Sequence, residues 1–343
     1  LLTNIRPRRQ DIEALVTNLR RNSGRELDAR VPSIKGDLQT DLFISRVAID
    51  CYPLVDSEYA FDIRKLRPRP FSLLELTRQG SIDDVLAAIL ISAIVSKMNI
   101  SIVGEPGSGK TTLLCALDLV TPPWWRKIYI EDAVELRSYS ESNSAHCLRI
   151  IVDPFESSES SRRKSDEIIK VLHRNPSYVV LGEVQFKDHF KALFQAMAAG
   201  IKLIHTAHAP SGRGFIQRVV NVYGIPSELV SNLDVLVEME KLESFRDVRR
   251  VVSGAYFLTG NDPSGKEQGQ QSSLREIGRC PRIEDGHRIL EELETKNRKH
   301  SGSVVALFDQ VLDSIHTAQE NGSEILRFPL QHPRRNDGSG STG

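Results

Sequence analysis

Residues 99–114 read NISIVGEPGSGKTTLL, and this stretch decides the fold that we expect for the rest of the chain. The phosphate-binding loop pattern G-x-x-x-x-G-K-S/T is matched by Gly104, Gly109, Lys110 and Thr111. The apolar run from Ile100 to Val103 predicts the strand that must precede such a loop, and the residues after the loop predict a helix. Because strand, loop and helix follow in this order, a glycine-rich turn that matches the pattern by chance is disfavoured.

The residue types of this loop suit a polyphosphate. Glycines allow successive backbone N–H groups to turn inward around phosphates, and a helix that begins near Gly109 adds its N-terminal N–H groups and the positive end of its dipole. Lys110 is expected to reach the β- and γ-phosphates, and the Thr111 hydroxyl is expected to bind Mg²⁺. We therefore predict ATP and Mg²⁺ as cofactors. The predicted nucleotide-binding residues are Gly104, Glu105, Pro106, Gly107, Ser108, Gly109, Lys110, Thr111 and Thr112.

Composition limits the class of protein. A length of 343 residues predicts two or three domains with a full hydrophobic core. Lys plus Arg number 45 and Asp plus Glu number 45, so no net charge attracts nucleic acid or anionic lipid. The four cysteines lie far apart, which indicates neither a zinc site nor a disulfide framework and favours a reducing compartment.

The sequence predicts no membrane span. The longest apolar run, residues 85–95, is much shorter than the ~20 residues that a span requires, so it predicts a buried helix in a soluble protein. We find no signal peptide. Because the chain begins with Leu1 rather than Met, the sequence does not identify the natural N-terminus.

The hydrophobic pattern of the first 80 residues predicts a small α+β domain. Residues 9–21 carry apolar side chains at helical spacing, and residues 43–50 and 59–66 alternate as strands do. The sequence PRPF at residues 68–71 predicts the end of this domain, with a linker near residues 66–81.

Residues 81–258 alternate between helical patterns and short apolar runs. This alternation predicts an α/β core with a mostly parallel sheet and helices on both faces. Beyond it, residues 259–281 are polar and predict a disordered linker, residues 282–331 predict a helical C-terminal segment, and residues 332–343 predict a disordered tail. Ligands of such sheets bind beyond the carboxyl ends of the strands.

Three further apolar strands end in polar side chains. KIYIED places Glu131 and Asp132 at a strand end, YVVLGEV leads into Glu183, and IHTAHAPSGRG carries His205 and His208. Each alone is explained equally well by a solvated loop. Hydrolysis of a nucleotide needs a carboxylate that orients water and another that holds the Mg²⁺ shell, so the three together indicate a catalytic edge.

This order of motifs resembles the secretion-type traffic ATPases, which power type II and type IV secretion, type IV pili and the archaellum. Family members carry a phosphate loop, an acidic box similar to IEDxxEL, a strand ending in GE, and a histidine box similar to TxHA followed by an arginine. The corresponding stretches here are GEPGSGKT, YIEDAVEL, VVLGEV and HTAHAPSGRGFIQRV, and the resemblance covers about residues 25–258. GRELDARVP and FDIRKL are most similar to the archaeal pilus and archaellum branch. The resemblance implies a RecA-like P-loop core.

The resemblance also implies roles for individual residues. Glu131 would polarise the attacking water, Glu183 would complete the magnesium network with Thr111, and His208 would sense the γ-phosphate. Three arginines match family positions and are candidate contacts: Arg218 after the histidine box, and Arg46 and Arg64 in the N-terminal domain. The last two would act on ATP across a domain or subunit boundary, although a solvated strand position explains them equally well.

Three positions depart from the family pattern. Residues 172–177 read LHRNPS where the family usually has LRxxPD, Gln185 stands where an arginine usually follows GEV, and residues 199–201 read AGI where TGH is usual. Loss of an arginine removes a permanent, bidentate charge. We therefore expect nucleotide binding to persist, while hydrolysis is slow or uses arginines from elsewhere.

Three functional hypotheses follow. The first is a cytoplasmic motor ATPase at the inner face of the cell membrane, expected to be a homo-hexamer that acts on a polytopic membrane platform protein without inserting into the membrane. The second is a divergent subunit that binds ATP for assembly and hydrolyses it weakly. The third is a nucleic-acid translocase, which the balanced charge and the lack of a basic stripe with aromatics disfavour. The sequence does not identify the cargo.

Overall fold

The computed structural model describes residues 6–23, 26–39, 44–67, 69–132, 146–152, 163–244, 247–258, 274–276, 281–297 and 303–323. The chain divides into two compact units, Leu1–Pro70 and Phe71–Gly343, which are described separately. The predicted tail at residues 332–343 and most of the predicted linker at residues 259–281 lie outside the described residues. Within that linker, however, Leu274–Glu276 form strand β11, so these three residues belong to a sheet.

The first unit is a three-stranded antiparallel sheet covered by one helix. Its elements are α1 (Arg9–Ser23), β1 (Ser33–Gln39), β2 (Ile44–Cys51) and β3 (Tyr59–Leu66), with strand order β1-β2-β3. Side chains on a strand alternate between its two faces, so Val47 and Ile49 of β2 point to one face, where they are buried together with Leu19 of α1. This arrangement confirms the predicted small α+β domain.

The second unit is built on an eight-stranded sheet with the order β11-β10-β9-β4-β8-β7-β5-β6. The strands from β9 to β6 run parallel, while β10 and β11 add antiparallel pairs at one edge. The predicted mostly parallel sheet is therefore confirmed. The bounds are β4 (Ile100–Gly104), β5 (Lys127–Glu131), β6 (Cys147–Ile151), β7 (Tyr178–Val184), β8 (Leu203–His208), β9 (Val235–Glu243) and β10 (Val248–Leu258).

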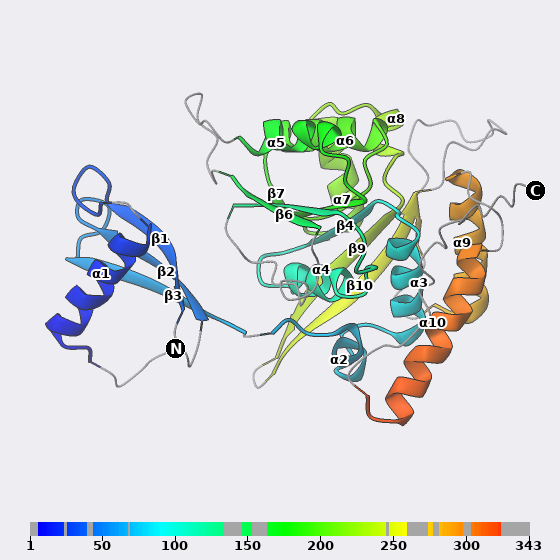
Figure 1. The fold of residues 1–343 in the computed structure, drawn as a ribbon, viewed down its shortest axis with the longest axis horizontal. Coiled ribbons are helices and arrows are strands. Elements are labelled where there is room, and N and C mark those ends of the chain that lie inside the picture. Colours follow the sequence, from blue (N-terminus) through cyan, green and yellow to red (C-terminus); the bar gives the residue numbers. More distant parts are fainter. Residues whose placement is uncertain are drawn as a thin grey trace, which may run out of the picture. The chain divides into compact units, whose positions relative to one another are not determined.

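Helices cover both faces of this sheet, and each face has its own hydrophobic cluster. Figure 1 shows α5 and α6 on one side and α3, α9 and α10 on the other. One face carries α2 (Leu73–Arg78), α3 (Asp84–Val95), α4 (Lys110–Asp118), α9 (Ile283–Lys296) and α10 (Ser303–Glu320). The other face carries α5 (Lys164–Lys170), α6 (Lys187–Ala198), α7 (Gly212–Gln217), α8 (Ser227–Val230), a 3₁₀ turn (Val171–His173) and a π turn (Arg218–Val222).

Helix α3 is apolar on all sides because it is enclosed. Its N-terminus is capped by the Asp83 carboxylate, which accepts hydrogen bonds from the N–H groups of Val85 and Leu86. Every residue from Leu86 to Ile94 is buried, with α9 and α10 packed against the helix. The predicted buried helix is thus confirmed. Among the described residues, no helix combines the length and the apolar character needed to cross a membrane.

The two C-terminal helices, α9 and α10, belong to the hydrophobic cluster that also contains α3. Phe308 of α10 is fully buried in the same cluster as α3. A Cβ atom on Gly286 of α9 would lie 2.9 Å from the Phe308 ring, so the two helices pack closely at this glycine. Arg78 of α2 donates to the carbonyl oxygens of Ala318 and Ser323 at 3.1 and 2.6 Å and holds the end of α10.

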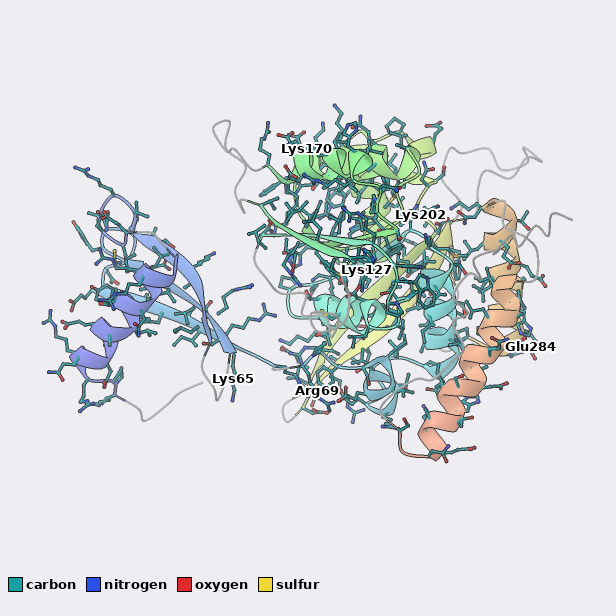
Figure 2. The ribbon with its side chains drawn as sticks, in the orientation of Figure 1. Lys65, Arg69, Lys127, Lys170, Lys202 and Glu284 are labelled. Atoms are coloured by element: carbon teal, nitrogen blue, oxygen red, sulfur yellow. The ribbon has the colours of Figure 1, made fainter. Side chains whose placement is uncertain are left out.

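A buried polar network joins the helix after the phosphate loop to the first acidic strand. The Lys127 ammonium at the start of β5 donates to Asp118 Oδ1 at 2.8 Å and to the Thr121 hydroxyl at 2.9 Å. The Tyr129 hydroxyl donates to the other Asp118 oxygen at 2.8 Å. Figure 2 labels Lys127 in the interior of this unit. Because each partner is satisfied, the network fixes α4 against β5.

We predict that Phe308→Ala destabilises the protein by about 3–5 kcal/mol, because it removes a fully buried aromatic side chain and leaves a cavity beside α3. Urea unfolding followed by circular dichroism measures this change. The control is Gln310→Ala on the exposed side of the same helix, expected to change stability by less than about 0.5 kcal/mol. Equal stability of the Phe308→Ala variant and the wild type would contradict a core role for α10.

Candidate active site

The predicted motifs meet because parallel strands end at the same edge of the sheet. In the strand register Gly104 at the end of β4 lies between His208 of β8 and Met239 of β9. At the end of β5, Glu131 lies beside Gly182 of β7, where an added Cβ would be 3.5 Å from Glu131 Cγ. The phosphate loop, the acidic box, the GE strand and the histidine box are therefore neighbours in space.

The phosphate loop requires its glycines for two different reasons. At Gly104 a Cβ would lie 2.3 Å from the Met239 carbonyl oxygen, so a side chain is excluded by close approach. Gly107 and Gly109 have φ values of 76° and 99°, which L-residues with side chains rarely adopt. Gly109 is also the N-cap of α4, whose first N–H groups point into the loop. These features fit a polyphosphate.

Lys110 is buried at the centre of the site, with 6% of its surface exposed. Its ammonium donates to the carbonyl oxygens of Gly104 and Glu105 at 3.0 and 2.8 Å and lies 3.2 Å from His208 Nδ1. Burial lowers the pKa of Lys110, and the charge of Glu183 opposes this shift. A phosphate oxygen would be a stronger partner than the loop carbonyls, because it carries a full charge.

His208 connects Lys110 to Glu183. Its Nδ1 faces the Lys110 ammonium and its Nε2 contacts Glu183 Oε1. Because Lys110 only donates, Nδ1 accepts, and a neutral His208 then carries its proton on Nε2, the nitrogen that faces Glu183. The other Glu183 oxygen accepts a hydrogen bond from Gln185 Nε2 at 2.9 Å. Gln185 thus places a neutral amide against the Glu183 carboxylate, at the position where members of the family that the sequence resembles usually have an arginine.

A β-bulge in β7 aims Glu183 at this site. In the pairing of β7 with β8, the register shifts between Leu181 and Val184, so two residues of β7 face one residue of β8. Val184 consequently joins the same hydrophobic cluster as Leu181, although simple alternation would place it on the opposite face. The shift leaves Gly182 and Glu183 outside the pairing, and the Gly182 carbonyl accepts from the Thr206 hydroxyl instead.

Glu131 is 1% exposed and forms an ion pair with Arg149 of β6. The Arg149 guanidinium also lies over the Tyr129 ring, 5.0 Å from its centroid. β5 and β6 pair in parallel with Tyr129 opposite Arg149, which brings the guanidinium within reach of the strand end. The Glu131 carboxylate is therefore held in one orientation by a neighbouring strand.

Three side chains at this edge were not singled out by the sequence patterns. Arg149 sits in an ordinary strand pattern, Lys164 follows two arginines in a run that reads as solvated, and Arg250 lies in β10 far from any motif. Lys164 is nevertheless 1% exposed and pairs with the Asp132 carboxylate. Arg250 donates from Nε to the Gly107 carbonyl oxygen at 2.8 Å and supports the outer side of the phosphate loop.

Arg218 is directed toward the main chain of the histidine box. Its guanidinium donates to the His208 carbonyl oxygen and lies over the rings of Phe190 and Tyr223, with centroid distances of 5.9 and 5.7 Å. A contact of Arg218 with nucleotide stays a prediction. Its observed contacts make it a support for His208.

Arg46 and Arg64 lie in the first unit. They are directly opposite each other on β2 and β3, on the sheet face that points away from α1, and Arg64 is exposed. On its other side Arg46 lies opposite Asp37 of β1. Their predicted contact with ATP stays a prediction, because they belong to the other unit.

His205 is part of the core. It is fully buried, lies 2.5 Å from the Ser101 hydroxyl through Nε2, and has Phe190 and Phe215 as ring neighbours. Burial lowers the pKa of His205 to about 4, so it is neutral at physiological pH. Of the two histidines that the sequence singles out in this box, only His208 reaches the phosphate loop.

The departures at residues 172–177 and 199–201 precede β7 and β8, respectively. Because these strands are parallel and the site lies at their carboxyl ends, both departures lie at the opposite edge of the sheet. Only Gln185 changes a side chain at the site.

Comparison with known proteins identifies the family and the fold of the chain. A family model described as "Type II/IV secretion system protein" matches residues 1–326. The Methanocaldococcus jannaschii protein MJ0900 is 28% identical over 341 residues, which cover 91% of this chain and 60% of the relative. MJ1287 from the same archaeon is 33% identical over 181 residues, or 52% of this chain and 66% of the relative. The type IV secretion system protein PtlH of Bordetella pertussis is 32% identical over 197 residues, 54% of this chain and 56% of PtlH.

The chain thus spans less than two thirds of the length of these relatives, and the two archaeal matches agree with the predicted archaeal branch. Among solved structures, the Legionella pneumophila ATPase DotB gives a TM-score of 0.52 at 18% identity and covers 77% of this chain and 72% of DotB. The pilus retraction motor PilT with bound ADP gives 0.50 at 13% identity, covering 91% of this chain and 76% of PilT. At these identities the likeness concerns the fold, and it confirms the expected RecA-like core.

We predict that His205 makes the protein less stable in acid. Between pH 6.5 and 4 the unfolded chain binds a proton at this position that the folded chain excludes, so stability is full above this range and falls as the pH drops. At pH 5 the loss is on the order of 2 kcal/mol. Urea unfolding at pH 7.5 and 5.0 should show a smaller loss for His205→Asn than for the wild type, whereas exposed His173→Asn should match the wild type. An unchanged pH dependence in His205→Asn would contradict this assignment.

Proposed function

The chain belongs to the type II/IV secretion system protein family, and on that premise we propose that it is a Mg²⁺-dependent ATPase motor subunit for pilus or archaellum assembly or for secretion. One observation carries this proposal. Lys110 of the phosphate loop, His208 and Glu183 form one continuous chain of contacts across the ends of three parallel strands. Such a chain links the group that binds the terminal phosphates to a carboxylate suited to the metal shell.

The residues at the loop fit both ATP and Mg²⁺. The narrow approach at Gly104 and the left-handed glycines leave a backbone cradle, and Lys110 holds its place on loop carbonyls. Thr111 and Glu183 would hold Mg²⁺, which when bound neutralises charge on the phosphate oxygens. When ATP binds, the Lys110 ammonium exchanges its carbonyl partners for phosphate oxygens.

The remaining groups divide the work of hydrolysis. Glu131 is the proposed base that orients the attacking water, and Arg149 fixes its carboxylate. His208 lies between Lys110 and Glu183, so a change of partner at Lys110 is passed to Glu183 through the imidazole. This position accounts for its proposed role as γ-phosphate sensor.

We further propose a homo-oligomer, a hexamer by analogy with the family, that works in the cytoplasm at the inner face of the cell membrane on a membrane platform protein. Arg46 and Arg64 are proposed to act on nucleotide bound by a neighbouring subunit. PtlH is named as a type IV secretion system protein and PilT as a pilus retraction motor. Those names do not choose between pilus, archaellum and secretion roles for this chain.

A second candidate function is an ATP-binding assembly subunit that hydrolyses weakly. The contact of Gln185 with Glu183 favours it, because a neutral amide stabilises less negative charge than an arginine does. Arg149 fixes the carboxylate of the proposed base Glu131 at the same edge, which favours the motor.

We predict that Lys110→Ala lowers ATP turnover at least about a hundredfold, because it removes the only side-chain charge among the predicted loop residues that is aimed at the phosphates. The fold should persist, since glycines and backbone bonds form the loop. ATPase assays and thermal unfolding measure both effects. The matched control is Lys187→Ala, an exposed lysine at the start of α6, which should behave as the wild type. Undiminished ATP affinity in Lys110→Ala would contradict our placement of the phosphates.

A second variant separates the motor from the assembly subunit. Glu131→Gln keeps the shape of the side chain and removes its basicity, so turnover should fall about a hundredfold while ATP binding persists. Steady-state phosphate release and fluorescent-nucleotide titration measure the two quantities. If the wild type and Glu131→Gln release phosphate at the same rate, the motor hypothesis fails.

A further inference from the structure

We infer that Lys164 is a positioning residue that sets the relative placement of the two acidic strand ends. This inference rests on the proposed function, because it concerns the geometry of the same site. Lys164 is the first residue of α5, and its ammonium lies between the end of β5 and the end of β7.

The contacts of Lys164 reach both strands. Its Nζ lies 2.5 Å from Oδ1 of Asp132, the residue that follows Glu131. The same Nζ donates to the Glu183 carbonyl oxygen at 2.7 Å. Asp132 is the neighbour of the proposed base Glu131 in the sequence. The carbonyl oxygen belongs to Glu183, the proposed metal ligand. One ammonium group therefore ties both acidic motifs to the same helix.

The β7 bulge explains why the Glu183 carbonyl is available. Gly182 and Glu183 fall in the register shift between Leu181 and Val184, outside the β7–β8 pairing. A partly buried carbonyl that lies outside the strand pairing needs another donor. Lys164 provides it, so the main chain of Glu183 is fixed by Lys164 while its side chain contacts His208.

The Lys164 ammonium is enclosed by the Asp132 carboxylate and the Glu183 main chain, so its charge is compensated locally. Only 1% of the Lys164 side chain is exposed, against 24% for Asp132. Burial raises the pKa of Asp132, and Lys164 opposes that shift. Loss of the lysine alone would leave a largely buried carboxylate without its cation, which is strongly destabilising. Lys164 hence acts through the main chain of Glu183 and the side chain of Asp132.

The test compares Lys164→Met with Lys170→Met. Lys170, labelled in Figure 2, lies on the same helix, is 54% exposed and pairs with Glu167 at 2.9 Å. Lys164→Met should lower kcat at least about tenfold while the ATP dissociation constant changes less than about threefold, because the phosphate loop is untouched and only the acids move. Lys170→Met should match the wild type in both quantities.

The double variant Asp132→Asn/Lys164→Met distinguishes a loss of kcat caused by misplaced acids from one caused by unfolding. It removes both charges, so thermal stability should recover relative to Lys164→Met, while kcat stays low because the Glu183 carbonyl still lacks its donor. Lys164→Arg, which keeps a donor and a charge, should recover part of kcat. Wild-type kcat in the double variant would overturn the inference.

Amide hydrogen exchange tests the geometry without any catalytic readout. In the double variant, exchange should accelerate at least about tenfold in peptides that cover residues 178–184, and should stay unchanged in residues 100–110 of the phosphate loop. Unchanged exchange at residues 178–184 would overturn the inference at any hydrolysis rate. A wild-type protein that binds ATP without hydrolysing it would instead contradict the proposed motor, and the exchange result would still decide the role of Lys164.

Discussion

The parallel pairing of β8 with β4 is the constraint on which the rest of the site depends. Its register sets His208 opposite Gly104, at the point where the phosphate loop leaves the sheet. A slip of one residue would turn His208 to the other face of the sheet and take His205 away from Phe190 and Phe215. The apolar surroundings of His205 oppose that slip, because its ring packs against Phe190 and Phe215. The buried histidine thus helps to place the functional one.

Three carboxylates at the active edge have partners that different elements supply. Glu131 pairs with Arg149 of β6, and Asp132 pairs with Lys164 of α5. Glu183 contacts His208 of β8, which in turn faces the Lys110 ammonium. Because buried charges are costly unless paired, this arrangement makes the site stable before a nucleotide arrives. On the proposed function, a bound triphosphate would take Lys110 as a partner and so change the contact between Lys110 and His208.

The departures from the family pattern have unequal consequences. Two lie before β7 and β8, at the sheet edge opposite the phosphate loop, where they bear on packing and turns. Gln185 lies at the active edge and weakens the charge beside Glu183. Two cations from outside the family boxes, Arg149 and Lys164, lie at the same edge, where they pair with Glu131 and Asp132. The chemistry of the site therefore depends on residues that the motif pattern omits.

The sequence alone determined the phosphate loop, the α/β class and the strand ends where the acids and histidines lie, because these depend on local spacing and on the rule that parallel strands end together. The strand-end pattern alone did not distinguish His205 from His208, which lie on one strand; the family resemblance selected His208, and packing decided that His205 is buried. The sequence patterns also did not indicate three cations at the site, because each comes from an element outside the motifs: Arg149, Lys164 and Arg250. Only the tertiary structure decided these contacts, since sheet order, the β7 bulge and burial are properties of the folded chain.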